Sequence, residues 1–271
     1  LLRACLLPLL ALLLAGCGGD PAAQPVRFWA MGREAEVVSV LVEEFERESG
    51  IEVEIQQIPW TAAHEKLLTA FAADAMPDVC QLGNTWIPEF AQLGALQPLQ
   101  ARVDASASIE PADYFPGIWD TAVVDGQLVG VPWYVDTRLL FYRKDLLREA
   151  GVGQLPRTWA EWEQAMAAVK RHLGPGRHAI LMPLNEFEQQ LSLALQQDDP
   201  LLRDDDTRGN FSSPGFRRAL AFYANVFEQG WAPKVSETQI SNVWDEFFRG
   251  SYAFYLSGPW NIREFRRRQP P

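Results

Sequence analysis

The feature that most constrains the fold is an alternation of strand-like and helix-like segments near the start of the chain. Five segments are predicted as strand, helix, strand, helix and strand: 26–30, 34–48, 51–55, 61–74 and 79–82. Strands that alternate with helices through short connections predict a parallel, right-handed α/β layer. In such a layer ligands collect at the carboxyl ends of the strands. Those ends are therefore the first place to look for binding residues.

Polar and aromatic residues follow two of these strands. Arg33 and Glu34 come after the first strand, and Asn84 and Trp86 come after the third. Carboxylate, guanidinium and amide groups can hydrogen-bond hydroxyls, and an indole ring can cover an apolar ligand face. Two alternatives stay open, because Trp86 could belong to the core and Glu34 could simply favour a helix N-terminus.

A segment in the middle of the chain, Gly130 to Asp145, places three unlike side chains at alternate positions. Tyr134, Asp136 and Arg138 share one face if the segment is extended. A ring, a carboxylate and a guanidinium on one face would suit a polar, ring-shaped ligand. The alternative is a strand whose Asp136 and Arg138 form an ordinary surface ion pair.

The second half of the chain again alternates helices and strands. Thr158 and Glu161 have capping-box spacing and start a helix, a strand is predicted over 178–182, and a helix over 185–197 begins beside Glu186. Glu186 is either a ligand contact or an acid favoured at a helix entry. A strand over 252–256 ends in Ser257-Gly258-Pro259-Trp260, where Trp260 either offers a ring to a ligand or plugs the end of the sheet.

The first residues are expected to be a targeting segment rather than part of the fold. An apolar run and the sequence Leu14-Ala15-Gly16-Cys17 resemble a bacterial lipoprotein signal. This predicts a signal peptide over 1–16, lipidation of Cys17 and a tether over 17–25 that holds the protein to the membrane. An ordinary signal peptide is the alternative.

Composition limits the function classes. The net charge of −11 argues against nucleic acid and anionic lipid as partners. Only Cys80 would remain unmodified in the mature chain, so no disulfide is expected within it, and the three His residues lack ligand spacing. No metal and no cofactor is predicted.

Several motifs together resemble a known family. They are Gly-Val-Pro-Trp-Tyr-Val-Asp-Thr-Arg at 130–138, Pro-Arg-Thr-Trp at 156–159, Phe-Phe-Arg-Gly at 247–250 and Gly-Pro-Trp at 258–260. The resemblance runs from about Phe28 to Trp260. It is to the extracellular solute-binding proteins of ABC sugar importers, in the maltose- and trehalose-binding branch.

The resemblance implies an α/β protein with the two-lobed periplasmic-binding-protein fold of type II. An N-terminal lobe over 26–134 and a C-terminal lobe over 135–271 are expected, each a mainly parallel sheet flanked by helices, joined by a hinge. A di- or oligosaccharide would bind in the interlobe cleft of a monomer and pass to a membrane permease. Both lobes are expected to be incomplete, because family members are typically longer.

The resemblance also implies roles for individual residues. Glu34 and Asn84 match positions of polar ligand contacts, although Asp is common where this chain has Asn84. Trp260, after Gly258, matches the sugar-stacking platform. Two other classes stay open: the same fold with an anion, peptide or polyamine ligand, which Arg33 and Arg138 would suit if it is anionic, and a carbohydrate-active enzyme. The enzyme requires two carboxyls at a defined separation.

Overall fold

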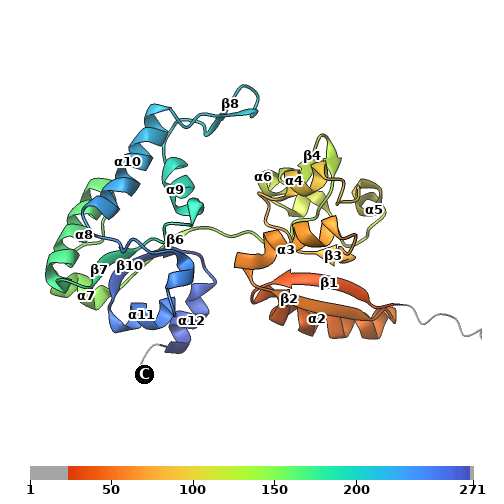
Figure 1. Cartoon of the computed structure of the whole chain (residues 1–271), viewed down its shortest axis with the longest axis horizontal. Helices are drawn as coiled ribbons and strands as arrows, with labels where there is room; N and C mark the ends of the chain where they lie inside the picture. Colours follow the sequence, from red (N-terminus) through yellow and green to blue (C-terminus); the bar gives the residue numbers. More distant parts are fainter. Residues whose placement is uncertain (1–23, 269–271) are drawn as a thin grey trace, which may run out of the picture. The chain divides into compact units, whose positions relative to one another are not determined.

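The computed structural model describes residues 24–268. The chain divides into two compact units, with the boundary between Tyr134 and Val135 (Figure 1). The predicted signal peptide, Cys17 and the first part of the tether lie outside the described residues. Among the described residues, no helix is both long and apolar enough to cross a membrane.

Unit 1 is built on the three-stranded sheet β2–β1–β3. Its elements in chain order are β1 (Val26–Met31), α2 (Glu34–Ser49), β2 (Val53–Ile58), α3 (Trp60–Ala72), β3 (Val79–Cys80), α4 (Ile87–Gln92), α5 (Gln100–Asp104), η1 (Pro111–Asp113), α6 (Pro116–Asp120), β4 (Val123–Val124) and β5 (Gln127–Leu128). All pairs in the three-stranded sheet are parallel, with Val26 opposite Val53 and Phe28 opposite Val79. The predicted alternation and parallel sheet are confirmed.

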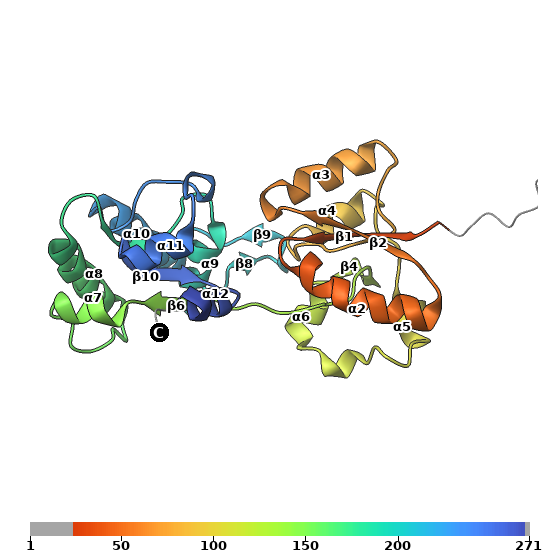
Figure 2. The same ribbon diagram turned by 90° about the horizontal axis from the view of Figure 1, so that it is seen from below.

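The helices α2 and α3 lie on opposite faces of this sheet (Figures 1 and 2). Met31, Ile58, Leu67 and Phe90 form the centre of the core on the α3 face and are almost completely buried. A smaller cluster around Val103, Ala122 and Leu128 sits under the antiparallel hairpin β4–β5. These cores fix the loops at the carboxyl ends of β1, β2 and β3.

Unit 2 has the three-stranded sheet β6–β10–β7. Its elements are β6 (Leu139–Tyr142), α7 (Lys144–Glu149), α8 (Trp159–Leu173), β7 (His178–Leu181), α9 (Phe187–Ala194), β8 (Leu202–Arg203), β9 (Arg208–Gly209), α10 (Pro214–Glu228), η2 (Glu237–Gln239), α11 (Val243–Arg249), β10 (Tyr252–Ser257) and α12 (Asn261–Arg268). The strand β10 is parallel to β7 and antiparallel to β6. The sheet of unit 2 is therefore mixed rather than mainly parallel. The chain enters the unit through the antiparallel strand β6.

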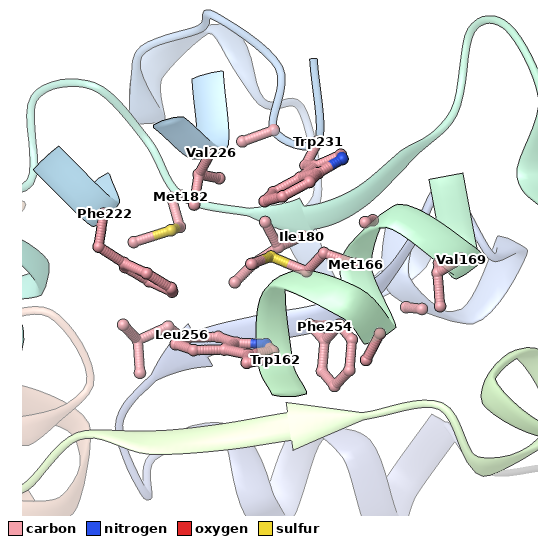
Figure 3. Close-up of a cluster of buried hydrophobic side chains, with 14 of the residues drawn as sticks. Trp162, Met166, Val169, Ile180, Met182, Phe222, Val226, Trp231, Phe254 and Leu256 are labelled. Atoms are coloured by element: carbon pink, nitrogen blue, oxygen red, sulfur yellow. The ribbon is translucent and has the colours of Figure 1, made fainter. Parts of the chain in front are cut away.

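Two hydrophobic clusters cover the two faces of this sheet, because neighbouring residues of a strand point to opposite sides. Phe254 and Leu256 join the larger cluster, which α8 and α10 cover (Figure 3). Tyr255 joins the smaller one with Phe247 of α11 and Phe265 of α12. The single buried strand β10 thus holds helices on both sides and carries the chain to Gly258 and Trp260.

Local signals predicted several of these elements closely. The capping box of α8 is present, with Thr158 Oγ1 accepting from Glu161 N–H at 3.2 Å. The helix α9 begins at Phe187 rather than at residue 185, because the backbone of Glu186 is extended. No strand is formed over 129–138, and β6 begins only at Leu139.

Candidate functional site

Three loops meet at the carboxyl edge of the sheet in unit 1. Gln57 Nε2 donates to the carbonyl oxygen of Gly32 at 2.5 Å, which joins the loops after β2 and β1. Gly32 has a φ of 51°, a conformation that glycine adopts without strain. A Cβ at this position would lie 3.1 Å from the Trp60 ring. Glycine therefore allows the indole of Trp60 to lie against the first loop.

A chain of hydrogen bonds orients Glu34 at this edge. The backbone N–H of Met31 donates to Gln81 Oε1 at 2.7 Å, and Gln81 Nε2 donates to Tyr134 Oη at 3.0 Å. Tyr134 Oη in turn donates to Glu34 Oε1 at 3.1 Å. Gln81 is buried, whereas Tyr134 is 42% exposed. The carboxylate of Glu34 is thus held by groups anchored in the sheet, and its remaining acceptor positions can serve a ligand.

Aromatic rings stand beside this chain of hydrogen bonds. The centroids of Trp60 and Trp86 are 5.8 Å apart, and His64 lies 5.2 Å from Trp86. His64 is also hydrogen-bonded to Glu89, at 2.6 Å between Nε2 and Oε2. Trp60 is 39% exposed, so part of its ring is available for stacking. Trp86 is half-buried: it packs against the core of unit 1, and the rest of its side chain is exposed.

The remaining predicted residues near this edge hold different positions. Arg33 is half-buried at the N-cap of α2. Asn84 is exposed in the loop after β3. Asp136 is exposed in the segment that enters unit 2, so Tyr134 and Asp136 fall on different sides of the unit boundary.

In unit 2 the platform predicted at Trp260 is an exposed ring. Trp260 is 45% exposed, and a Cβ at Gly258 would overlap its ring. The guanidinium carbon of Arg138 lies 5.3 Å from the centroid of Trp260, a cation–π distance. Arg138 Nη2 is also 3.7 Å from Glu188 Oε1. These contacts bring Arg138 and Trp260 together while nearly half of the Trp260 surface stays exposed.

Glu186 follows β7 on the same unit and is held in an unusual electrostatic state. Burial is the main cause that raises the pKa of Glu186 to about 7, and repulsion from Glu237 is the second. Attraction to Arg138 opposes this rise. Gln189 Nε2 donates to Glu186 Oε2 at 2.7 Å. A carboxyl that is half-protonated near neutral pH can both donate and accept hydrogen bonds.

A cavity of about 220 Å³ adjoins Glu186. Its lining combines acidic, amide and aromatic groups: Leu181, Pro183, Glu186, Glu237, Ile240, Ser241, Asn242, Val243, Trp244 and Tyr255. Burial raises the pKa of Tyr255 to about 12, so this phenol stays protonated at physiological pH. The cavity is at the carboxyl end of β7, the location that the sequence indicated for Glu186.

The residues that sequence reasoning missed are those placed by contacts distant in the chain. Trp60 follows the second strand directly, so its position at a strand end was a usable signal. Gln81, Glu237 and Asn242 gave no such signal, because Gln81 reads as part of a strand and the other two lie in an irregular loop. Among the described residues, no group of three or more His, Cys, Asp or Glu side chains could hold a metal ion.

Each of the two α/β units has an exposed ring beside hydrogen-bonding side chains at a sheet edge, an arrangement suited to a polar ligand. The comparison with known families agrees: this chain belongs to the bacterial extracellular solute-binding proteins, whose sequence pattern matches residues 32–269. The fold predicted from the resemblance is confirmed by solved structures, including one of the sugar-binding protein MalE from the phytopathogen Xanthomonas citri. That structure is 72% identical, with a TM-score of 0.74 over 92% of this chain and 63% of that one.

Curated relatives are more distant in sequence. The diacetylchitobiose binding protein DasA of Streptomyces coelicolor is 24% identical over 263 residues, which are 91% of this chain and 60% of that protein. An uncharacterised lipoprotein of Streptomyces antibioticus is 33% identical over 66% of this chain and 41% of that protein. The chain thus spans less than two thirds of the length of these relatives.

Proposed function

We propose that this protein binds a sugar, a disaccharide or short oligosaccharide, and delivers it to the permease of an ABC importer. The observation that carries the proposal is the same in both units: an exposed indole stands beside charged hydrogen-bonding groups at a sheet edge. In unit 1 these are Trp60 with Glu34, and in unit 2 they are Trp260 with Arg138. Sugar rings present apolar C–H faces and a rim of hydroxyls, which such pairs complement.

Both sets of groups are proposed to serve the same ligand. Arg33, Asn84, Trp86, Tyr134 and Asp136 are proposed as further contacts, together with Glu186. The similarity to MalE and DasA supports a sugar rather than another solute, because those proteins are described as binding a sugar and diacetylchitobiose. Micromolar affinity corresponds to about 8 kcal/mol, which a few charge-assisted hydrogen bonds and stacked rings can provide.

The ligand is proposed to leave the protein unchanged. Membership of a family of binding proteins supports this. The raised pKa of Glu186 would suit a general acid, yet acid catalysis of glycoside cleavage also requires a second carboxyl across the scissile bond.

The protein is proposed to act in the bacterial cell envelope, at its periplasmic or extracellular face, anchored to the membrane through lipidated Cys17. The motif Leu14-Ala15-Gly16-Cys17 supports this, as does the similarity to a lipoprotein of Streptomyces antibioticus. Cys17 lies outside the described residues, so the support is from sequence alone.

Tryptophan fluorescence tests the proposal, because the chain has ten Trp residues and several stand at the candidate site. We expect a saturable change with at least one of trehalose, maltose, maltotriose, sucrose and glucose. Trp260→Ala should weaken that affinity roughly tenfold or more, because it removes a stacked ring. Phe211→Ala removes an exposed ring elsewhere in unit 2 and should leave the affinity unchanged. Folded protein that responds to no sugar would overturn the proposal, and release of new reducing ends would move it to an enzyme.

A further inference from the structure

The cavity of unit 2 has preformed walls. The backbone N–H of Glu237 donates to Asn185 Oδ1 at 2.7 Å, and the N–H of Leu184 donates to the carbonyl of Val235 at 2.9 Å. These bonds tie the loop after β7 to the segment that carries η2. The third wall is the start of α11, where Asn242 Oδ1 accepts from the N–H of Asp245 at 3.1 Å. These hydrogen bonds therefore fix the walls of the cavity within unit 2.

The wall of the cavity is hydrogen-bonded to the turn that carries Trp260. Tyr255 lies in β10, two residues before Ser257 and three before Gly258. Trp244, which lines the cavity, donates from Nε1 to Asn261 Oδ1 at 2.8 Å, and Asn261 Nδ2 donates to Ser257 Oγ at 2.9 Å. Hydrogen bonds thus connect the cavity wall to the turn that presents Trp260.

Carboxylates dominate the charge at the cavity. Glu186 and Glu237 line it, and Glu188 acts on Glu186 as a third like charge. The cation that acts on Glu186 is Arg138, which is already 3.7 Å from Glu188 and stacked at 5.3 Å on Trp260. Repulsion from Glu237 outweighs the attraction of Arg138 in setting the pKa of Glu186. The electrostatic potential at Glu186 is therefore unfavourable for further negative charge.

A buried amide side chain supports Glu186 at the cavity. Gln189 is completely buried, and its Nε2 donates to Glu186 Oε2. Its Oε1 accepts no hydrogen bond from the described residues. Gln189 is not among the residues that line the cavity, so the groups that a ligand can reach are the carboxyls of Glu186 and Glu237. Ionised carboxylates accept hydrogen bonds, so hydroxyl groups of a ligand would be suitable donors here.

We propose that this cavity is a subsite that receives hydroxyl groups of the ligand, and that its carboxylates select neutral sugars against anionic ones. The inference rests on the proposed function and deepens it by naming the substrate class as neutral polyhydroxylated rings. Arg33 and Arg138, which taken alone suit an anion, do not set the selectivity. A bound anion would face Glu186 and Glu237 at short range, which weakens binding by roughly tenfold or more.

Calorimetric titration with matched neutral and anionic sugars tests this inference. The probes are maltose against maltobionate and trehalose against trehalose 6-phosphate. The unmodified protein should bind the neutral member of at least one pair tenfold or more tightly, by the repulsion argued above. Glu237→Gln, at an exposed position, removes one negative charge. It should therefore reduce the ratio of the neutral-sugar affinity to the anionic-sugar affinity about threefold or more. Glu228→Gln, at the exposed end of α10, is the matched control and should leave the ratio unchanged.

The outcomes distinguish a failure of the proposed subsite from a failure of sugar binding itself. If neutral sugars bind but the ratio is the same in Glu237→Gln and Glu186→Gln as in the unmodified protein, the subsite is overturned while sugar binding stands. Tighter binding of an anionic sugar overturns the subsite as well. If no neutral sugar binds to folded protein, the proposed function itself is overturned.

Discussion

The carboxyl of Glu186 takes its charge state from burial more than from any cation. Its pKa in the folded protein is about 7, against an ordinary value of 4.5. The folded state therefore holds a proton that the unfolded state releases between these two values. The contribution of this proton to stability is fully present below about pH 4.5 and is lost as the pH rises through 7. Glu186 is thus maintained in unit 2 at a cost to stability, as expected of a binding group.

Replacing this carboxyl by an amide should remove that cost. Glu186→Gln is expected to be more stable than the unmodified protein at pH 8, by on the order of 2 kcal/mol, and to differ much less at pH 5. Urea unfolding of both proteins at the two pH values measures the difference. A stability difference that is the same at pH 5 and pH 8 would contradict the raised pKa.

The turn after β10 shows how one element presents a ring. Strand β10 is buried along its whole length, and Gly258 at its end provides the space in which the ring of Trp260 lies. Resemblance to the family's motif predicted that Trp260 would be a stacking platform, and the exposed ring is compatible with that prediction. The motif could not show that the ring rests on Gly258 itself, since this depends on the rotamer of Trp260.

Gly258→Ala is therefore expected to displace the ring of Trp260. Sugar affinity should fall roughly tenfold, similar to the loss of a stacked ring. The free energy of unfolding should change little, because the ring is half exposed and can move away from the core. Titration and urea unfolding measure the two effects. Gly153→Ala, where a Cβ meets no atom within 4 Å, is the control. Full affinity in Gly258→Ala would contradict the role of this turn.

Helices and strands were predictable where the signal is local. The capping box of α8 and the alternation of the first five segments needed only short-range patterns. The exposure of the apolar side of α2 could not be predicted from such patterns. Val37, Leu41 and Phe45 recur at helical spacing, yet they are 54%, 58% and 46% exposed. Spacing shows that side chains share a face, but burial depends on what packs against that face.

Across the whole molecule, the sequence predicted the positions of the candidate residues better than their partners. Strand ends and motifs indicated Glu34, Tyr134 and Trp260 as ligand contacts, and their side chains are exposed or half-exposed. The bond from Gln81 to Tyr134 joins residues 53 apart, and the tie between Asn185 and Glu237 joins residues 52 apart. Such contacts are set by the packing of each unit, which no short motif encodes. The extended face predicted for Tyr134, Asp136 and Arg138 likewise fell across the boundary of the two units.

Calorimetry on two variants tests most directly the proposal that residues of both units contribute to sugar binding. Tyr134→Phe removes the hydroxyl that orients Glu34 in unit 1, and Trp260→Ala removes the ring in unit 2. We expect each variant to stay folded and to bind the sugar identified by fluorescence more weakly, by about threefold for Tyr134→Phe and tenfold or more for Trp260→Ala. Unchanged affinity in either variant would contradict the claim, because that unit would then contribute no ligand contact of the kind described.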